Sequence, residues 1–359
     1  MSGVVKQIKK PPYSVPLMTE IENLPWNGFK VASTFSGCGG SCLGYRMAGY
    51  KVVYANEFIE SAQQTYKANH PNSFLDTRDI RKITAEDVLE KLDLNCGDLD
   101  LLDGSPPCAA FSTAGKREAG WGKEKKYSDT TQRVDDLFYE YARLLKGLQP
   151  KVFVAENVAG LVKGTAKGYF KRILRTLKEC GYNVRCKILD AQWLGVPQMR
   201  QRTIFIGVRN DLNRDPSHPL PLPYQYSVGD ALLNLDAPIE AQFLNKNTDT
   251  YKYWQDCKPG ESLGVPYQKL TGKTGFYTHV KQSPFRIANT ILQGANQLYH
   301  WSEPRTFSIS ELKRVGGFPD DFKLAGSFSQ KWERIGRAVP PIMMASIAKT
   351  IHRDILSKI

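Results

Sequence analysis

The chain has 359 residues, of which 41% are hydrophobic and 24% are charged. These fractions are typical of a globular protein with a sizeable core and exclude a chain that is disordered throughout. Lys and Arg number 49 against 36 Asp and Glu, a net charge of +13, which favours a polyanionic partner, either nucleic acid or an acidic membrane surface. Because the sequence contains no run of about 18 apolar residues, we expect no membrane span.

The seven cysteines are odd in number and scattered, which is typical of reduced thiols in a cytoplasm rather than of a disulfide framework. Cys38 and Cys42 are spaced like half a zinc site, but no second Cys or His pair with suitable spacing follows, so we expect no metal. Residues 1–15 are polar and basic without an apolar signal core, and we expect them to form a flexible arm.

The next two hundred or so residues alternate short β-like runs with amphipathic helical stretches. Six runs are strand candidates, at residues 31–35, 52–55, 99–103, 152–156, 184–189 and 203–208. Strands that alternate with helices predict βαβ units, and therefore an α/β fold in which a parallel sheet carries helices on both faces.

The alternation stops near Asn210. Residues 211–283 are rich in Pro, Gly, Asn, Tyr and Lys without clean periodicity, and predict a loop-rich module. Helical patterning returns at 308–315, where Ser308 and Glu311 fit a capping box, and again after Pro341. We therefore expect a large domain from residues 16–210 and 323–359 and a small domain at 211–322.

A glycine-rich turn follows the first strand candidate, with the sequence Phe35-Ser36-Gly37-Cys38-Gly39-Gly40. Glycines at a strand-to-helix turn let backbone N–H groups approach a ligand, and the next helix presents its positive end. The dinucleotide pattern G-x-G-x-x-G is not matched, so a plain tight turn stays open as an alternative.

Two acidic residues further along favour a nucleotide-type ligand at this turn. Glu57 follows the second strand candidate, where a carboxylate can accept hydrogen bonds from ribose hydroxyls. Asp79 could accept from an adenine amino group while Ile80 covers the ring. Each acid also has an ordinary interpretation, a helix-starting acid for Glu57 and a surface turn residue for Asp79. Together the three segments suit an adenosine-containing cofactor.

A candidate nucleophile follows the strand at 99–103, in the sequence Gly104-Ser105-Pro106-Pro107-Cys108. Ligands bind beyond the carboxyl ends of parallel strands, so Cys108 should lie at the edge of the site, where its thiolate can attack. A buried Cys that acts as a small hydrophobe is the alternative. The basic, glycine-containing stretch after Cys108 predicts either a mobile lid that grips phosphates or a solvated loop.

Six ordered motifs resemble the cytosine-C5 DNA methyltransferases of prokaryotic or phage type. They are the glycine-rich turn, Pro106-Pro107-Cys108, Glu156-Asn157-Val158, Gln198-Met199-Arg200-Gln201-Arg202, Glu311 through Gly317-Phe318-Pro319, and Gly336-Arg337-Ala338-Val339-Pro340-Pro341. The resemblance covers most of the chain apart from the arm and residues 211–283. It implies a Rossmann-like sheet that binds S-adenosylmethionine in the large, catalytic domain, and target recognition by residues 211–283 in the small domain.

The resemblance also implies a chemistry, in which a target cytosine is flipped out of double-stranded DNA. Cys108 would attack C6, Glu156 would hold N3, and Arg200 and Arg202 would anchor the pyrimidine. The cofactor would be held by Phe35, Ser36, Gly37, Cys38, Gly39, Gly40, Glu57, Asp79, Ile80, Ser105, Pro107, Leu137, Arg337, Ala338 and Val339. DNA would be contacted by Ser112, Lys116, Arg117 and Gln198, and its phosphates by Lys246, Lys252, Lys258, Lys269, Lys273 and Lys281. We expect a monomer, without a metal or a membrane partner.

The closing motif departs from the family, which has Asn where this chain has Arg337. Arg337 either points away to DNA or to a surface carboxylate, or impairs activity, or pairs with an anion on the cofactor. Carboxy-S-adenosylmethionine would supply such an anion and give 5-carboxymethylcytosine. Three other functions stay open: a nicotinamide or flavin oxidoreductase, a DNA-binding module without catalysis, and a tRNA cytosine-C5 methyltransferase.

Overall fold

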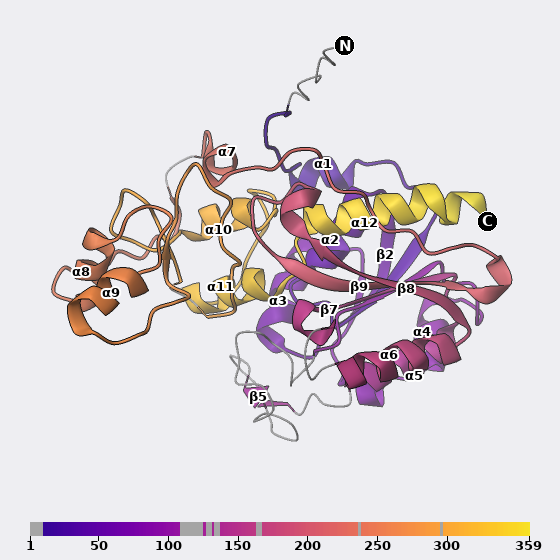
Figure 1. The fold of residues 1–359 in the computed structure, drawn as a ribbon. Helices are drawn as coiled ribbons and strands as arrows, with labels where there is room; N and C mark the ends of the chain where they lie inside the picture. Colours follow the sequence, from indigo (N-terminus) through magenta and orange to yellow (C-terminus); the bar gives the residue numbers. More distant parts are fainter. Residues whose placement is uncertain are drawn as a thin grey trace, which may run out of the picture.

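The computed structural model describes residues 10–107, 125–126, 131–132, 137–162, 167–235, 238–294 and 297–359. Within these residues the main element is a seven-stranded sheet with the strand order β3-β2-β1-β4-β7-β9-β8 (Figure 1). Its strands are β1 (Lys30–Thr34), β2 (Lys51–Asn56), β3 (Phe74–Asp76), β4 (Leu101–Gly104), β7 (Val152–Val158), β8 (Tyr182–Asp190) and β9 (Gln201–Arg209). All six strand candidates of the sequence overlap strands of this sheet.

The sheet is not wholly parallel, which corrects one expectation. β1, β2, β3, β4 and β7 pair in parallel, whereas β9 is antiparallel to both β7 and β8. The reason is the short connection between β8 and β9, which contains only the short helix η4 (Ala191–Leu194). A parallel return needs a crossover of roughly a dozen residues or more, usually a helix, so the shorter link reverses the strand.

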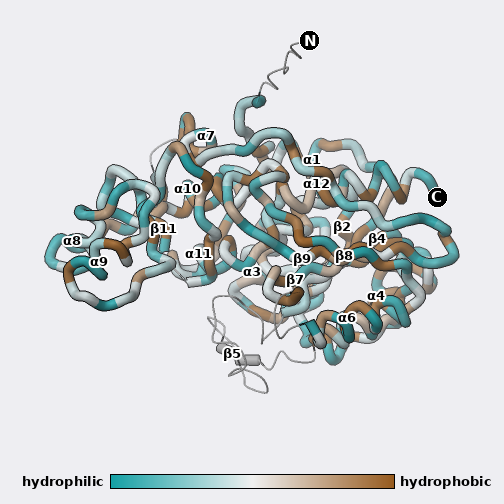
Figure 2. Tube along the Cα trace, viewed as in Figure 1, coloured by the Kyte–Doolittle hydropathy of each residue, from teal (hydrophilic) through white to brown (hydrophobic). Residues whose placement is uncertain are grey.

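Helices cover both faces of the sheet, as expected (Figure 1). α2 (Gly40–Met47) and α12 (Pro341–Asp354) pack on one face, while α4 (Ala85–Leu92), α5 (Leu137–Leu148) and α6 (Lys167–Glu179) pack on the other. Neighbouring residues of a strand face opposite cores, so Leu101 packs towards α12 and Leu102 towards α5. Figure 2 shows hydrophobic residues along the central strands. α1 (Met18–Glu22) and α3 (Glu60–Asn69) complete the helices of this domain, and β5 (Lys125–Lys126) and β6 (Thr131–Gln132) form a separate pair.

The small domain has more regular structure than its sequence predicts. Its elements are α7 (Val228–Leu232), α8 (Asp249–Asp256), α9 (Gly264–Thr271), β10 (Val280–Lys281), β11 (Leu298–Tyr299), α10 (Ile309–Val315) and α11 (Phe328–Arg337). The predicted capping box at Ser308 and Glu311 is confirmed. Trp332 of α11 is buried with Leu312 of α10, and we therefore propose that residues 328–337 belong to the small domain rather than to the large one.

The described part of the arm, residues 10–15, contacts the small domain. Lys10 Nζ lies 2.7 Å from Asp230 Oδ2. Tyr13 packs edge-on against Tyr226, and its hydroxyl donates to the carbonyl of Arg314 at 2.6 Å. Among the described residues, no helix is long and apolar enough to cross a membrane.

Candidate active site

The centre of the candidate site is an ion pair between two strands. Glu156 on β7 and Arg202 on β9 are largely buried, and Arg202 Nε lies 2.7 Å from Glu156 Oε1. The antiparallel pairing of β7 with β9 sets Glu156 opposite Ile204, two residues from Arg202, so both side chains emerge on the same face. Burial lowers the pKa of the Arg202 guanidinium, and the charge of Glu156 opposes this effect. The structure thus brings together two of the residues that the sequence singled out.

The turn before Cys108 is anchored to the strand that carries Glu156. β4 ends at Gly104, which pairs with Ala155 of β7, and Asn157 Nδ2 donates to the carbonyl of Pro106 at 3.2 Å. This places Ser105 and Pro107 at the same sheet edge as Glu156. The expected nucleophile and three expected DNA contacts, Cys108, Ser112, Lys116 and Arg117, lie outside the described residues.

A glycine is required at the end of β4. A Cβ on Gly104 would lie 2.5 Å from a ring carbon of Tyr141 and 2.6 Å from Thr34 Oγ1. Tyr141 lies this close because its hydroxyl donates to the carbonyls of Leu102 and Val154, and so joins β4 to β7. Leu137 on the same helix is fully buried in this core.

Two residues of the predicted Q-x-R-x-R motif hold the domains together instead of facing a substrate. Arg200 is 2% exposed and donates to the carbonyls of Ile291 and Gly336 at 3.0 and 2.8 Å. Gln198 is equally buried, donates to the carbonyl of Val315 and accepts from the N–H of Ile291. A side chain enclosed in this way cannot reach DNA, so the expected DNA contact of Gln198 is wrong. The same bonds point to a structural task for Arg200 in place of the expected pyrimidine contact.

The glycine-rich turn adopts the backbone that its glycines allow. Gly37 and Gly39 have φ values of 57° and 89°, and Phe35 has 54°, a region that L-residues other than glycine seldom occupy. A Cβ on Gly37 would meet nothing within 4 Å, so the side of the turn at Gly37 is open. Ser36 and Cys38 are buried, and burial raises the pKa of the Cys38 thiol to about 12.

Glu57 closes this turn from the end of β2. Its two carboxylate oxygens accept the N–H groups of Gly37 and Ile59, each at 2.7 Å. Burial raises the pKa of the Glu57 carboxyl, whereas the N–H donors of Ile59 and Gly37 and the charge of Arg334 oppose that effect. Glu57 thus lies beside the glycine-rich turn, and its contact with ribose hydroxyls stays a prediction.

Asp79 behaves as a turn residue. Its carboxylate accepts from the N–H of Arg81 and lies 3.0 Å from Arg81 Nη1, while the neighbouring Ile80 is buried. This matches the ordinary interpretation that the sequence left open for Asp79. An adenine contact there would need this ion pair to rearrange.

The start of α2 meets the closing motif. A Cβ on Gly40 would lie 2.5 Å from the carbonyl oxygen of Val339 and 3.0 Å from the Ala338 side chain, so only glycine permits this approach. Arg337 is exposed, and its Nε lies 2.7 Å from Glu333 Oε1, one helical turn earlier on α11. The structure thus pairs Arg337 with a carboxylate, as the first of the three interpretations has it, although Glu333 is buried.

A buried carboxylate below the site was not anticipated from the sequence. Asp103 on β4 is 1% exposed and accepts from Ser33 Oγ at 2.9 Å and from the Tyr45 hydroxyl at 3.2 Å. Burial raises its pKa to about 7, and these two hydrogen bonds oppose the effect. Ser36 of the glycine-rich turn donates in turn to Ser33. The one signal in the sequence was an Asp at the end of an apolar strand, immediately before Gly104-Ser105-Pro106-Pro107.

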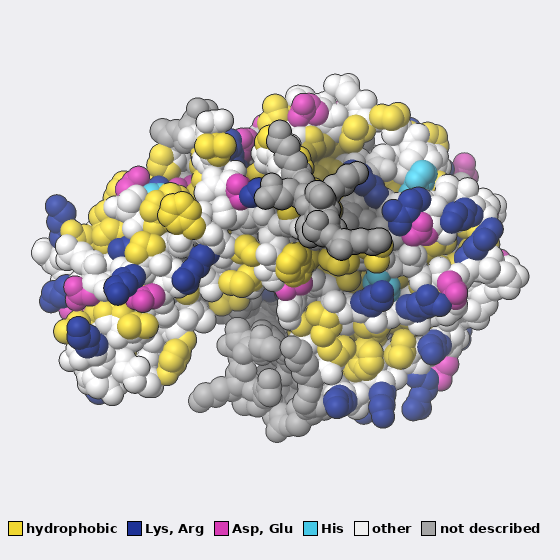
Figure 3. Space-filling view, turned by 45° about the horizontal axis from the view of Figure 1, so that its top comes forward, with side chains coloured by type: hydrophobic (Ala, Val, Ile, Leu, Met, Phe, Trp, Pro, Cys, Tyr) yellow, Lys and Arg dark blue, Asp and Glu magenta, His cyan; other side chains and the backbone are white. Residues whose placement is uncertain are grey.

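The six lysines expected to contact phosphates divide into two kinds. Five lie exposed, at Lys246, Lys252, Lys258, Lys269 and Lys273, and Figure 3 shows blue side chains of this kind spread over both domains. Lys281 is 6% exposed, donates to the carbonyl of Trp254 at 3.0 Å and lies over its ring at 3.9 Å. The expected phosphate contact of Lys281 is therefore wrong, because its ammonium group faces the core.

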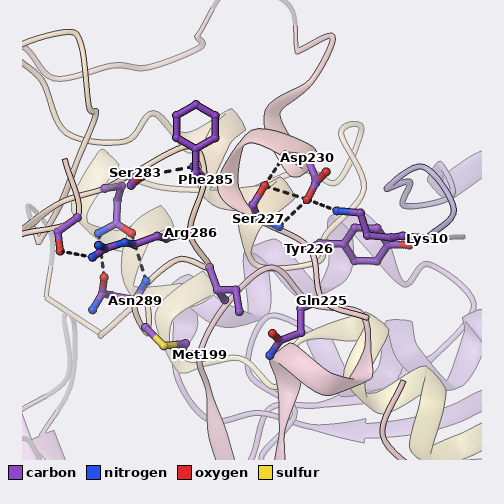
Figure 4. A pocket seen from close by; sticks show the side chains of 13 residues that line it. Lys10, Met199, Gln225, Tyr226, Ser227, Asp230, Ser283, Phe285, Arg286 and Asn289 are labelled. Carbon is purple, nitrogen blue, oxygen red and sulfur yellow. Dashed lines mark hydrogen bonds and ion pairs between the residues drawn. The ribbon is translucent and has the colours of Figure 1, made fainter. Parts of the chain in front are cut away.

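An open cavity of about 650 Å³ lies away from these residues, where the arm, α7 and residues 282–289 meet (Figure 4). Its wall includes Lys10, Tyr226, Asp230 and Arg286. Because neither Glu156 nor the glycine-rich turn lines it, it is separate from the candidate active site. The described residues contain no group of three or more His, Cys, Asp or Glu side chains that could hold a metal ion.

Comparison with known proteins gives a consistent result. The family model of the C-5 cytosine-specific DNA methylases matches residues 29–353. The chain is 31% identical to the type II methyltransferase M.NgoFVII of Neisseria gonorrhoeae, over 93% of this chain and 90% of the relative. It is 30% identical to M.NgoPII of the same organism, over 92% and 97%.

Solved structures share the fold. A prophage-encoded E. coli protein, proposed as a DNA modification methyltransferase, superposes with a TM-score of 0.69 at 24% identity, over 91% of this chain and 99% of that chain. A variant of Spodoptera frugiperda DNMT2 gives a TM-score of 0.61 at 17% identity, over 89% and 98%.

Proposed function

Because the chain belongs to the C-5 cytosine-specific DNA methylases, we propose that it transfers a methyl group from S-adenosylmethionine to C5 of a cytosine flipped out of duplex DNA. The observation that carries this proposal is the Glu156–Arg202 ion pair, set at the sheet edge to which Asn157 fixes the Pro106 carbonyl. That arrangement supports a cytosine ring that is held by the Glu156 carboxylate at N3 and attacked by Cys108 at C6.

The described residues fit the family's cofactor, S-adenosylmethionine. The turn is open at Gly37, Glu57 lies at its base, and Arg334 contributes buried donors that lack a hydrogen-bond partner in the described chain. A nucleoside sulfonium carries ribose hydroxyls, an amine and a carboxylate, which are the groups that such residues bind. Bound there, the cofactor supplies an electrophilic methyl group. Gly37, Gly39, Glu57, Ala338 and Val339 are the residues that we expect to hold it.

The protein groups account for the other half of the reaction. The Cys108 thiolate adds to C6 of the cytosine, which makes C5 nucleophilic. Glu156 shares a proton with N3 and accepts from the exocyclic amino group, which offsets the negative charge that develops on the ring, and Arg202 fixes the orientation of Glu156. After C5 has gained the methyl group, loss of the C5 proton and expulsion of Cys108 restore the aromatic ring.

Covalent trapping tests this function. Duplex DNA that contains 5-fluorocytosine blocks the final proton loss, so wild-type protein with S-adenosylmethionine should stay attached to the DNA. Cys108→Ala should bind the same DNA without becoming attached to it, and this variant is the matched control. An absence of trapping by the wild type would favour a DNA-binding module without catalysis, and methylation of tRNA but not of duplex DNA would favour the tRNA enzyme.

Carboxymethyl transfer from carboxy-S-adenosylmethionine is the alternative product. It needs Arg337 to hold the additional carboxylate next to the transferred carbon. Arg337 Nε already lies 2.7 Å from Glu333 Oε1, which favours plain methyl transfer because this partner offsets the charge.

A further inference from the structure

Arg334 on α11 is a buried cation with an incomplete set of partners. Its side chain is 2% exposed, yet Nε and Nη2 have no hydrogen-bond partner within the described chain. Nη2 does lie 3.1 Å from Glu333 Oε1, but that oxygen is also 2.7 Å from Arg337 Nε. Burial of guanidinium N–H donors without acceptors costs free energy unless another group accepts their hydrogen bonds.

α11 meets the glycine-rich turn at Arg334. The Cys38 thiol donates to the backbone carbonyl of Arg334 at 3.6 Å, so α11 packs directly on the turn. The charge of Arg334 lowers the pKa of both the Cys38 thiol and the Glu57 carboxyl against the effect of burial, as expected for a cation close to the turn. The Glu57 oxygens accept the N–H groups of Gly37 and Ile59, and neither oxygen forms a hydrogen bond with Arg334 Nε or Nη2.

The two unmatched donors share one edge of the guanidinium. Nε–H and the nearer Nη2–H point in the same direction and are spaced to meet both oxygens of a carboxylate. A carboxylate therefore fits this edge better than a hydroxyl or a carbonyl, each of which could satisfy a single donor.

We propose that Arg334 binds the α-carboxylate of the methionine part of the cofactor through Nε and Nη2. This inference rests on the proposed function, because it needs the cofactor to occupy the glycine-rich turn. It assigns to α11 a cofactor contact that the sequence motifs did not indicate, one helical turn before Ala338.

Two ligands that differ only in this carboxylate provide the test. S-adenosylhomocysteine and its decarboxylated analogue, which keeps the adenosine, sulfur and amine, are titrated by calorimetry into the full chain. Wild type should bind the carboxylate-bearing ligand at least about tenfold more tightly, as expected for a charge-assisted bidentate contact. Arg334→Gln should lose most of that preference. Arg334→Lys, which keeps the charge without the fork, should recover it only in part.

Lys331→Gln is the matched control, since it removes one positive charge from the same helix, where Lys331 pairs with Glu240. It should keep the full preference. Thermal unfolding of each variant checks folding, and the preference of the wild type can be measured without any substitution.

The outcomes separate the two proposals. If wild type binds both ligands equally, or if Arg334→Gln weakens both by the same factor, Arg334 is only a counter-ion for Glu57 and the inference is overturned while the proposed function stands. If wild type binds neither ligand, the cofactor assignment fails and the inference falls with it. The inference is also overturned if Arg334 binds only the additional carboxylate of carboxy-S-adenosylmethionine and not the α-carboxylate.

Discussion

Arg202 on β9 holds the carboxylate of Glu156 on β7, with Arg202 Nε 2.7 Å from Glu156 Oε1 and both side chains largely enclosed. The first prediction follows from this pair. Arg202→Gln should slow covalent trapping on 5-fluorocytosine DNA by on the order of 10²-fold, the effect of losing one preorganised polar contact in a catalytic site. Affinity for S-adenosylhomocysteine should stay within about twofold, because Arg202 does not contact the glycine-rich turn.

Arg185→Gln is the control for this experiment. Arg185 lies on the neighbouring strand β8 in an exposed ion pair with Asp215, and such pairs contribute about 0–1 kcal/mol. Its trapping rate should match that of the wild type. Equal rates for Arg202→Gln and Arg185→Gln would contradict the role assigned to the Glu156–Arg202 pair.

Asn157 should act by positioning the turn before Cys108. Its Nδ2 donates to the carbonyl of Pro106 and its Oδ1 accepts from the N–H of Val158. Asn157→Ala should reduce the trapping rate at saturating cofactor while the binding of S-adenosylhomocysteine is unchanged. Loss of one or two buried hydrogen bonds should also lower the free energy of unfolding by about 1–3 kcal/mol. An unchanged trapping rate in a correctly folded variant would show that the turn needs no such anchor.

Local sequence patterns were enough to predict the strands but not their directions. Continuous apolar runs mark β7 and β9, which are buried on both faces, whereas β8 is an edge strand with a largely alternating burial pattern. The antiparallel direction of β9 depends on the length and path of the link after Asp190, which periodicity does not encode. The helices α8 and α9 were missed because they are eight residues long and present only a few buried side chains each.

In the candidate site too, some contacts could be predicted from the sequence while others depend on tertiary packing. Chain order was enough to assign Glu57 and the glycine-rich turn to one ligand, and in the structure the parallel strands β1 and β2 that precede them are adjacent. Gln198, Lys281 and Arg334 are polar residues whose burial arises only from tertiary packing. A single sequence gives no indication of that, so Gln198 and Lys281 were assigned to DNA and Arg334 received no role.

Lys281 should be neutral in DNA binding although it lies in the lysine-rich module. Lys281→Met keeps the apolar stem over Trp254 and removes the ammonium group, so DNA affinity and its salt dependence should not change. Lys269→Ala combined with Lys273→Ala should weaken binding and reduce the slope of log K against log salt, by about one for each phosphate that is no longer neutralised. Fluorescence anisotropy at several salt concentrations measures both. A reduced slope for Lys281→Met would show that the buried lysine reaches a phosphate after all.

Asp103 should make stability fall as pH rises. Burial raises its pKa in the folded protein from 3.8 to about 7. Between these values the folded state binds more protons than the unfolded state, so the free energy of unfolding decreases with rising pH across this window. The total effect is at most about 4 kcal/mol, from roughly three pKa units at 1.36 kcal/mol each. Chemical unfolding between pH 4 and pH 8 measures it.

Asp103→Asn is the matched variant, because the uncharged amide keeps the shape: its oxygen can accept from one of the Ser33 and Tyr45 hydroxyls while its NH2 group donates to the other. Since other groups also titrate in this range, the informative quantity is the difference between wild type and variant. That difference should favour the variant increasingly from pH 4 to pH 7 and then level off. A difference that is independent of pH would mean that Asp103 is ionised throughout the window.

Arg337 is the residue on which carboxymethyl transfer would depend. We predict that it does not change the group transferred, which stays methyl. Its Nε lies 2.7 Å from Glu333 Oε1, so a cofactor carboxylate would have to compete with a carboxylate on the same helix. Duplex DNA incubated with S-adenosylmethionine should yield 5-methylcytosine, whereas DNA incubated separately with carboxy-S-adenosylmethionine should yield no modified cytosine when the nucleosides are analysed by mass. Arg337→Asn should give the same product from the first cofactor. A 5-carboxymethylcytosine signal that is present in the wild type and absent in Arg337→Asn would instead assign the second cofactor to this enzyme, with Arg337 as its carboxylate partner.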